Sequence, residues 1–94
     1  MQVRWTTPAA QDLGEITLYI QKDSESAAQA VARTLFDAAS SLDLLPSRGR
    51  AGRVPGTREL VVPGLPYIVA YQVTEEAIKI LHIYHGARDW PGEQ

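Results

Sequence analysis

The feature that most constrains the fold of this sequence is the apolar run that ends at Tyr84. Its many isoleucine, leucine and tyrosine residues are typical of a β-strand, in which side chains alternate between two faces. The predicted faces are Ile78, Ile80, His82 and Tyr84 on one side, and Lys79, Leu81, Ile83 and His85 on the other. Because both faces carry apolar side chains, we predict a central strand of a sheet and not an edge strand.

Two amphipathic helices are predicted upstream of this strand, over residues 8–22 and about 25–45. Thr7 and Pro8 are suited to begin the first helix, and Asp23 and Ser24 to cap the second. Apolar residues recur at helical spacing in both helices: Ala9, Leu13, Ile16 and Ile20, then Ala28, Val31, Leu35, Ala38, Leu42 and Leu45. Since only two or three residues separate the helices, they are predicted to form an antiparallel hairpin, which Pro46 ends.

The remaining strands place the chain in the α+β class. A short strand is predicted at residues 3–5, and three more at 57–62, 67–73 and 77–84 form an antiparallel meander because short turns join them. Residues 46–56, with two prolines and three glycines, are predicted to be a loop without regular structure. We therefore predict one domain, residues 1–94, of order β-α-α-β-β-β. Its helical hairpin packs on one face of a four-stranded, mostly antiparallel sheet, with the first strand beside either outer strand of the meander and the other face at least partly open.

Composition excludes several classes of function. With no cysteine, disulfide frameworks and cysteine-based zinc sites are excluded, and a reducing cytoplasm is the expected location. The first residues lack a signal-like apolar segment and no run reaches ~18 apolar residues, so we expect no membrane partner. The formal net charge of −2 argues against a general polyanion binder. Neither a cofactor nor a metal is expected, because no glycine-rich phosphate loop is present and His82 and His85 are predicted to face opposite sides of their strand.

Several motifs in the second half of the chain, taken in order, resemble one protein family. They are an Arg/Gly loop after the helical hairpin, Gly-Thr-Arg-Glu-Leu at 56–60, Pro-Tyr-Ile-Val-Ala-Tyr at 66–71, and His-Gly-Ala-Arg-Asp-Trp at 85–90. Together they resemble the RelE/ParE superfamily of bacterial toxins, and the likeness covers nearly the whole chain. The resemblance implies a cytoplasmic toxin of a type II toxin–antitoxin module, held inactive by an antitoxin whose extended or helical segment wraps it.

This superfamily has two effector branches. RelE-like members cut mRNA in the ribosome with arginines and other groups on the open sheet face, whereas ParE-like members poison DNA gyrase and lack that set. Arg88 resembles one nuclease arginine, but Ile68 falls where a second is often found, and the sequence has no counterpart of the tail tyrosine. We expect a ParE-like toxin that binds gyrase. The alternatives are a RelE-like, ribosome-dependent mRNA endoribonuclease and a non-toxic scaffold that binds the antitoxin.

If the chain is a nuclease, its catalytic candidates are Arg58, His85 and Arg88. Cleavage of RNA by its own 2′-hydroxyl needs an acid, a base and cationic stabilisation of the phosphorane, and histidine and arginine supply these. The alternative interpretation is structural: His85 forms a hydrogen bond at the strand terminus, and the arginines pair with Glu59 and Asp89.

Four arginines lie within eleven residues that contain no acid before Glu59: Arg48, Arg50, Arg53 and Arg58. This stretch is suited to bind an acidic antitoxin segment or a nucleic-acid backbone, and a solvated turn is the alternative. Trp90, near the end of the chain, is a further partner-binding candidate, with packing as the alternative. Tyrosines at alternating strand positions are more often core residues than stacking platforms for bases; they are Tyr67, Tyr71 and Tyr84.

Overall fold

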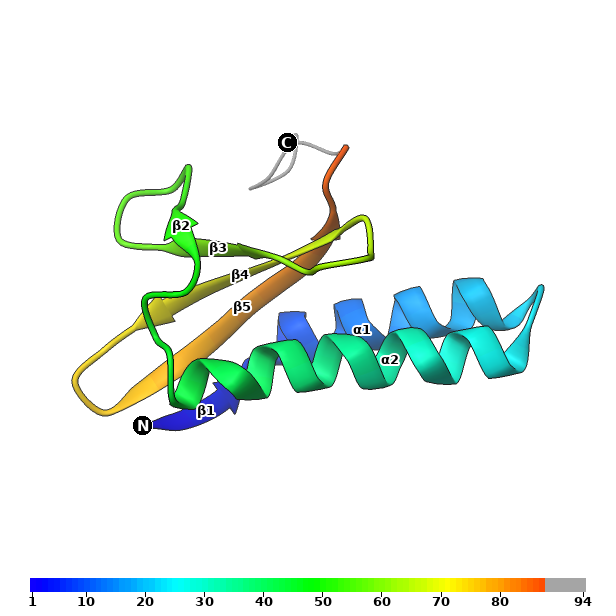
Figure 1. Ribbon diagram of the computed structural model, residues 1–94, viewed down its shortest axis with the longest axis horizontal. Helices are drawn as coiled ribbons and strands as arrows, with labels where there is room; N and C mark the ends of the chain where they lie inside the picture. Colours follow the sequence, from blue (N-terminus) through cyan, green and yellow to red (C-terminus); the bar gives the residue numbers. More distant parts are fainter. Residues whose placement is uncertain (88–94) are drawn as a thin grey trace.

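The computed structural model describes residues 1–87, which form two layers: a helical hairpin and a sheet (Figure 1). The elements are β1 (Gln2–Trp5), α1 (Thr7–Gln21), α2 (Glu25–Ser40), the 3-10 turn η1 (Ser41–Asp43), β2 (Arg50–Ala51), β3 (Arg58–Val61), β4 (Tyr67–Val73) and β5 (Ala77–His85). The predicted α+β class, with the hairpin on one face of a mostly antiparallel sheet, is confirmed. Over this part of the chain, no helix is long and apolar enough to cross a membrane.

The sheet has five strands, in the order β1-β5-β4-β3-β2. The strand β1 pairs in parallel with β5, while the other three pairings are antiparallel. The expectation of four strands was wrong because residues 50–51, placed in a loop without regular structure, pair with Glu59 and Arg58 as β2. Proline and glycine flank residues 50–51 in the sequence. Arg50 and Ala51 themselves have backbone N–H and C=O groups that can pair with a neighbouring strand.

A side chain caps the N-terminus of each helix in the hairpin. Thr6, not Thr7, caps α1 by accepting the Ala9 N–H, and Thr6 also donates to the Ile80 carbonyl of β5 at 2.6 Å. Ser24 caps α2 by accepting the Ala27 N–H, as predicted. The caps therefore set the helix starts, and the first one also joins α1 to the sheet.

The second helix ends at Ser40, earlier than the predicted residue 45. Serine hydroxyls compete for backbone groups, and Ser41 donates to the Ala38 carbonyl at 2.7 Å where the helix gives way to the 3-10 turn. Leu42 remains buried in that turn, whereas Leu45, predicted as an apolar helix position, is 59% exposed.

An irregularity in the pairing of β4 with β5 changes the predicted faces of β5. The partner of Ala70 is His82 and the partner of Tyr71 is Ile80, so Leu81 is an extra residue. Such a bulge shifts the alternation by one position. As a result Ile78, Ile80 and Ile83 share the face that meets the helices, while His82 and Tyr84 lie on the opposite face.

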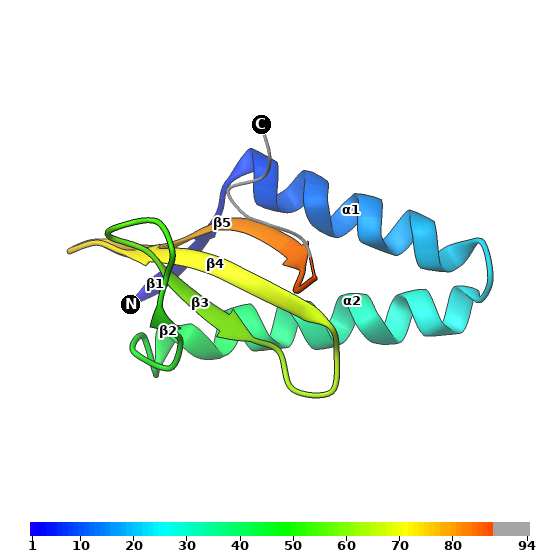
Figure 2. The ribbon, with the colours of Figure 1, turned by 90° about the horizontal axis from the view of Figure 1, so that it is seen from above.

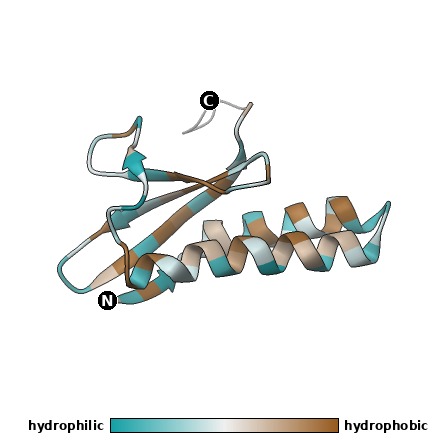
Figure 3. Cartoon of the chain, viewed as in Figure 1, coloured by the Kyte–Doolittle hydropathy of each residue, from teal (hydrophilic) through white to brown (hydrophobic). Residues whose placement is uncertain are grey.

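The core lies between the hairpin and this helix-facing side of the sheet. Viewed from above, the sheet lies over one end of the hairpin, and the turn between α1 and α2 projects beyond it (Figure 2). Apolar positions alternate with polar ones along the helices (Figure 3). The buried core residues are Ala9, Leu35, Ala39, Leu42, Leu60, Val62, Val69, Tyr71, Ile78, Ile80 and Ile83. Trp5 packs against this core and stacks on Phe36 with ring centroids 6.0 Å apart.

Candidate functional site

The arginine loop, defined as residues 46–57, is anchored by a tyrosine from the centre of the sheet. The Tyr71 hydroxyl donates to the Pro46 carbonyl at 2.7 Å and accepts the Gly49 N–H at 2.8 Å. Tyr71 is fully buried, which confirms the prediction of a core role. Both bonds end on the hydroxyl of one buried side chain, so they tie the start of the loop to the sheet.

Two of the predicted partner-binding arginines form hydrogen bonds with neighbouring groups of this chain. Arg58 lies on β3, and its Nη1 donates to the Gly49 carbonyl at 2.6 Å. Arg48 Nη1 donates to the Ser41 hydroxyl at 2.7 Å, joining the loop to the end of the helical hairpin. These contacts tie the arginine loop to β3 and to the end of the helical hairpin.

The other two arginines share a buried carboxylate. Glu59 is 2% exposed, and it accepts hydrogen bonds from Arg50 Nη2 at 3.1 Å and from the Arg53 N–H at 3.0 Å. Arg53 Nε lies 3.8 Å from the same carboxylate. Burial raises the pKa of the Glu59 carboxyl, but the Arg53 N–H and the Arg50 guanidinium outweigh burial and hold the pKa below its ordinary 4.5. Glu59 is therefore an anion under neutral conditions, and it holds both arginines.

Next to this carboxylate, the sheet face opposite the helices is apolar. Ile68, Ala70 and Tyr84 form a small buried cluster there, which confirms a core role for Tyr84. Burial raises the pKa of the Tyr84 hydroxyl, and the nearby charge of Glu59 raises it further. A buried apolar cluster thus lies beside a pair of exposed guanidinium groups on this face.

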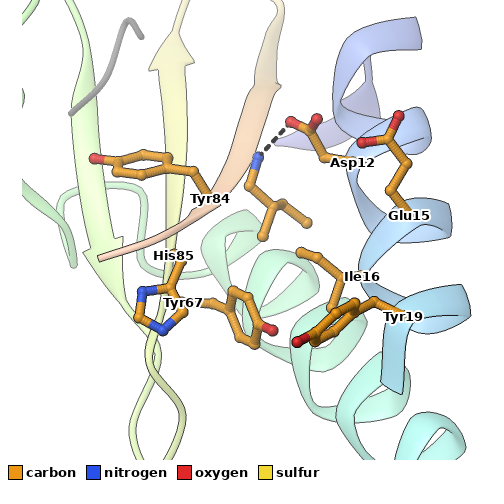
Figure 4. Close-up of a pocket in the computed structure, with 8 residues that line it drawn as sticks. Asp12, Glu15, Ile16, Tyr19, Tyr67, Tyr84 and His85 are labelled. Carbon is orange, nitrogen blue, oxygen red and sulfur yellow. Dashed lines mark hydrogen bonds between the residues drawn. The ribbon is translucent and has the colours of Figure 1, made fainter. Parts of the chain in front are cut away.

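A separate cleft of about 460 Å³ lies at the far end of β5, beside α1 (Figure 4). We name it the terminal cleft; it is lined by Asp12, Glu15, Ile16, Tyr19, Tyr67, Ile83, Tyr84 and His85. Asp12 Oδ2 accepts the Ile83 N–H at 3.0 Å and also lies 3.0 Å from His82 Nδ1. Since β1 pairs only with residues 77–80, this contact covers part of the remaining free edge of β5.

His85 borders the terminal cleft and is exposed. Its ring meets Tyr67 edge-on with centroids 5.7 Å apart, and its Nδ1 accepts the Ala87 N–H at 3.1 Å. This is the terminal hydrogen bond that the structural interpretation of His85 expects. Among residues 1–87 no three histidine, aspartate, glutamate or cysteine side chains cluster closely enough to hold a metal ion.

The sequence-predicted catalytic residues do not come together over the described part of the chain. Arg58 is opposite Tyr71 of β4, and His85 is opposite Tyr67 of the same strand. Four residues of strand separate these two positions by roughly 13 Å, too far for one phosphate to contact both groups directly. Arg88 and Trp90, the other predicted residues, lie outside the described residues.

Residues 3–90 match the family described as the ParE toxin of the type II toxin–antitoxin system parDE. The chain belongs to this ParE toxin family. Among curated proteins, it is 39% identical over 90 residues to the candidate toxin Y4kP of Sinorhizobium fredii, covering 96% of this chain and 93% of that one. It is also 41% identical over 87 residues to toxin RelE2 of Caulobacter vibrioides, covering 93% and 97%.

Solved structures from both a ParDE and a RelBE system are similar to this chain. A chain from the chromosomal ParDE toxin–antitoxin system of P. aeruginosa superposes with a TM-score of 0.83 at 27% identity, covering 90% of this chain and 95% of that chain. A chain of the toxin–antitoxin complex RelBE2 of Mycobacterium tuberculosis gives a TM-score of 0.56 at 26% identity, covering 89% and 88%. The predicted resemblance to the RelE/ParE superfamily is confirmed.

Sequence reasoning found the arginines of this ParE-family chain but not the groups that hold them. Glu59, with Asp89, was considered as a partner for the catalytic candidates Arg58 and Arg88, whereas Glu59 forms ion pairs with Arg50 and Arg53. The sequence does contain a signal for this pairing. Glu59 is an acidic residue inside a predicted strand, and a carboxylate in a sheet needs a cationic or hydrogen-bonding partner nearby. The hydroxyl contacts of Tyr71 had no such signal, because they depend on the path of the loop.

Proposed function

We propose that this protein is the toxin of a type II toxin–antitoxin pair, that a cognate antitoxin neutralises it, and that it acts by binding DNA gyrase. Membership of the ParE family supports the toxin role. An antitoxin partner is supported by the similar P. aeruginosa chain, which comes from a ParDE system, and by the M. tuberculosis chain, which was solved in a toxin–antitoxin complex.

The observation that carries the choice of effector is the environment of Ile68. This side chain is 6% exposed and packs with Ala70 and Tyr84 on the sheet face away from the helices. RelE-like nucleases use that face for cationic and acid–base groups, and Ile68 falls where a catalytic arginine is often found. A buried apolar cluster there supplies no cationic or acid–base group that stabilises a phosphorane, and this favours an effector that acts by binding.

A RelE-like mRNA endoribonuclease is the second candidate, and two observations favour it. One relative is named toxin RelE2. His85 is also exposed at the strand end beside the terminal cleft, where an RNA substrate has access to it. In this candidate mechanism His85 acts as acid or base, and Arg58 and Arg88 stabilise the phosphate charge.

The effector is tested by two assays on the purified protein. The first follows DNA supercoiling by gyrase with increasing amounts of the protein, and the second follows cleavage of ribosome-bound mRNA by primer extension. We expect loss of supercoiling that is restored when the protein encoded by the adjoining reading frame is added, because that protein is the expected antitoxin. We expect no mRNA cleavage.

The outcomes separate the candidates. Cut mRNA with unchanged supercoiling would overturn the gyrase proposal, and a loss of cleavage of roughly 10²-fold or more in His85→Ala would then assign the acid–base role. In cells that express the chain alone, gyrase inhibition is expected to give an SOS response with filamentation. Unhindered growth together with no effect in either assay would leave only antitoxin binding, as in a non-toxic scaffold.

A further inference from the structure

Glu59 is an unusual residue for its position. It lies in β3 between Arg50 of β2 and Ala70 of β4, on the sheet face that the helices do not cover, yet it is 2% exposed. Acidic side chains are almost never fully buried unless they are paired. Buried ion pairs contribute little net stability compared with apolar residues, so stability alone does not account for a carboxylate here.

The partners of Glu59 are reachable from solvent although the carboxylate is not. The Arg50 and Arg53 side chains are 57% and 42% exposed, while the Glu59 side chain is 1% exposed. Each guanidinium has five N–H donors, and Arg50 uses one of them on Glu59. Glu59 thus holds the Arg50 guanidinium by a hydrogen bond, and it holds Arg53 by the backbone N–H with the Arg53 Nε 3.8 Å away. Most donors of the two guanidinium groups remain available on the outer side.

We propose that Glu59 is a positioning residue that aims Arg50 and Arg53 together, as one clamp, at the carboxylates of an acidic partner segment. Side chains that are already ordered lose less conformational entropy when a partner binds, and arginine forks match carboxylates in a bidentate geometry. The identification of that partner as the antitoxin rests on the proposed function. The clamp itself rests on the contacts of Glu59.

The charge at the clamp favours an acidic peptide over a nucleic acid. Binding along a phosphate backbone draws affinity from many cationic contacts, and this chain has a formal net charge of −2. Glu59 offsets one of the two positive charges of the clamp, and Arg58 and Arg48 direct hydrogen bonds to Gly49 and Ser41 of this chain. Together with Glu59, the two guanidinium groups carry a net charge of +1, which suits the binding of one or two carboxylates.

Replacing Glu59 with glutamine distinguishes a positioning role from a purely electrostatic one, because the two roles change the affinity for an acidic partner in opposite directions. Loss of a negative charge beside the arginines strengthens attraction to an acidic partner if Glu59 is only a charge. If Glu59 aims the clamp, Glu59→Gln is expected to weaken binding about tenfold despite the added net positive charge. Glu75→Gln, an exposed acid in the β4–β5 turn, is the matched control for the same change of net charge.

The binding probes are a hexaglutamate peptide and the antitoxin from the adjoining reading frame. NMR signals of the arginine Nε–H groups report the peptide, and calorimetry reports the antitoxin. We expect saturable shifts at Arg50 and Arg53, and a binding affinity about tenfold weaker in Glu59→Gln. In an Arg50→Ala/Arg53→Ala background, where calorimetry reports the affinity for the antitoxin, the further Glu59→Gln change is expected to leave that affinity unchanged. If Glu59→Gln does not fold, Glu59→Asp keeps the charge, shortens the side chain, and is expected to weaken binding in the same way.

Tighter binding in Glu59→Gln, no peptide shift at either arginine, or an equal loss in the double-alanine background would each overturn the clamp. A protein that binds hexaglutamate through Arg50 and Arg53 but does not bind the adjoining gene product would contradict the antitoxin assignment and leave the clamp in place. The two proposals therefore fail in different experiments.

Discussion

Truncation of Leu35 to alanine is expected to lower the free energy of unfolding by about 3–4 kcal/mol. Leu35 lies on α2, is 0% exposed, and belongs to the core cluster between the hairpin and the sheet. Its removal leaves a cavity that the surrounding strands fill only in part. A domain of this size is stable by about 5–15 kcal/mol, so the loss is a large share of the total. Urea denaturation followed by circular dichroism measures it.

Leu18→Ala is the matched control, with the same substitution on the other helix. Leu18 is 64% exposed, so its truncation is expected to change the free energy of unfolding by no more than about 0.5 kcal/mol. Similar losses for the two leucines would contradict the arrangement in which α2 presents Leu35 to the sheet and α1 presents Leu18 to solvent.

Gly49→Ala is expected to lower the free energy of unfolding by about 2–3 kcal/mol. A Cβ at this position would lie 2.8 Å from the Tyr71 hydroxyl oxygen and 2.9 Å from the Glu59 carbonyl oxygen. Tyr71 is fully buried and Glu59 contributes backbone, so neither can move away easily. The substitution therefore forces the start of the arginine loop off the sheet, and thermal denaturation is expected to show the loss.

The control substitution for Gly49→Ala is expected to change the free energy of unfolding in the opposite direction. Gly14 lies inside α1, and a Cβ there meets nothing within 4 Å. Gly14→Ala is expected to stabilise the protein by about 0.5–1 kcal/mol, because alanine has the better helix propensity and restricts the unfolded chain. Equal effects of the two alanines would show that crowding at Gly49 is not the cause.

Local signals predicted much of the fold. The apolar stripes of the two helices include Ala9 and Leu35, both fully buried, and the cap at Ser24 forms as expected. Residues 67–73 were predicted as a strand with the bounds that β4 has. These features depend on neighbouring residues and on alternation, so a single sequence contains the information.

The features that the sequence did not predict depend on contacts between distant segments. The bulge at Leu81 arises where β5 meets β4, and it reverses the faces of His82 and Tyr84 relative to Ile78. The strand β2 exists only because residues 50–51 return to β3. The grouping of Arg50 and Arg53 on Glu59 follows from that return. The composition of the loop predicts a turn, but it does not predict which residues the turn packs against.

The most direct test of this account is amide hydrogen exchange at Gly49 and Arg53 in the protein without any partner. Their N–H groups donate to Tyr71 and Glu59, the two residues that hold the arginine loop in place. We predict that both amides exchange at least about 10²-fold more slowly than in an unstructured peptide, because only opening of the loop exposes them. Exchange at the rate of an unstructured peptide would contradict an arginine loop that is ordered before it binds.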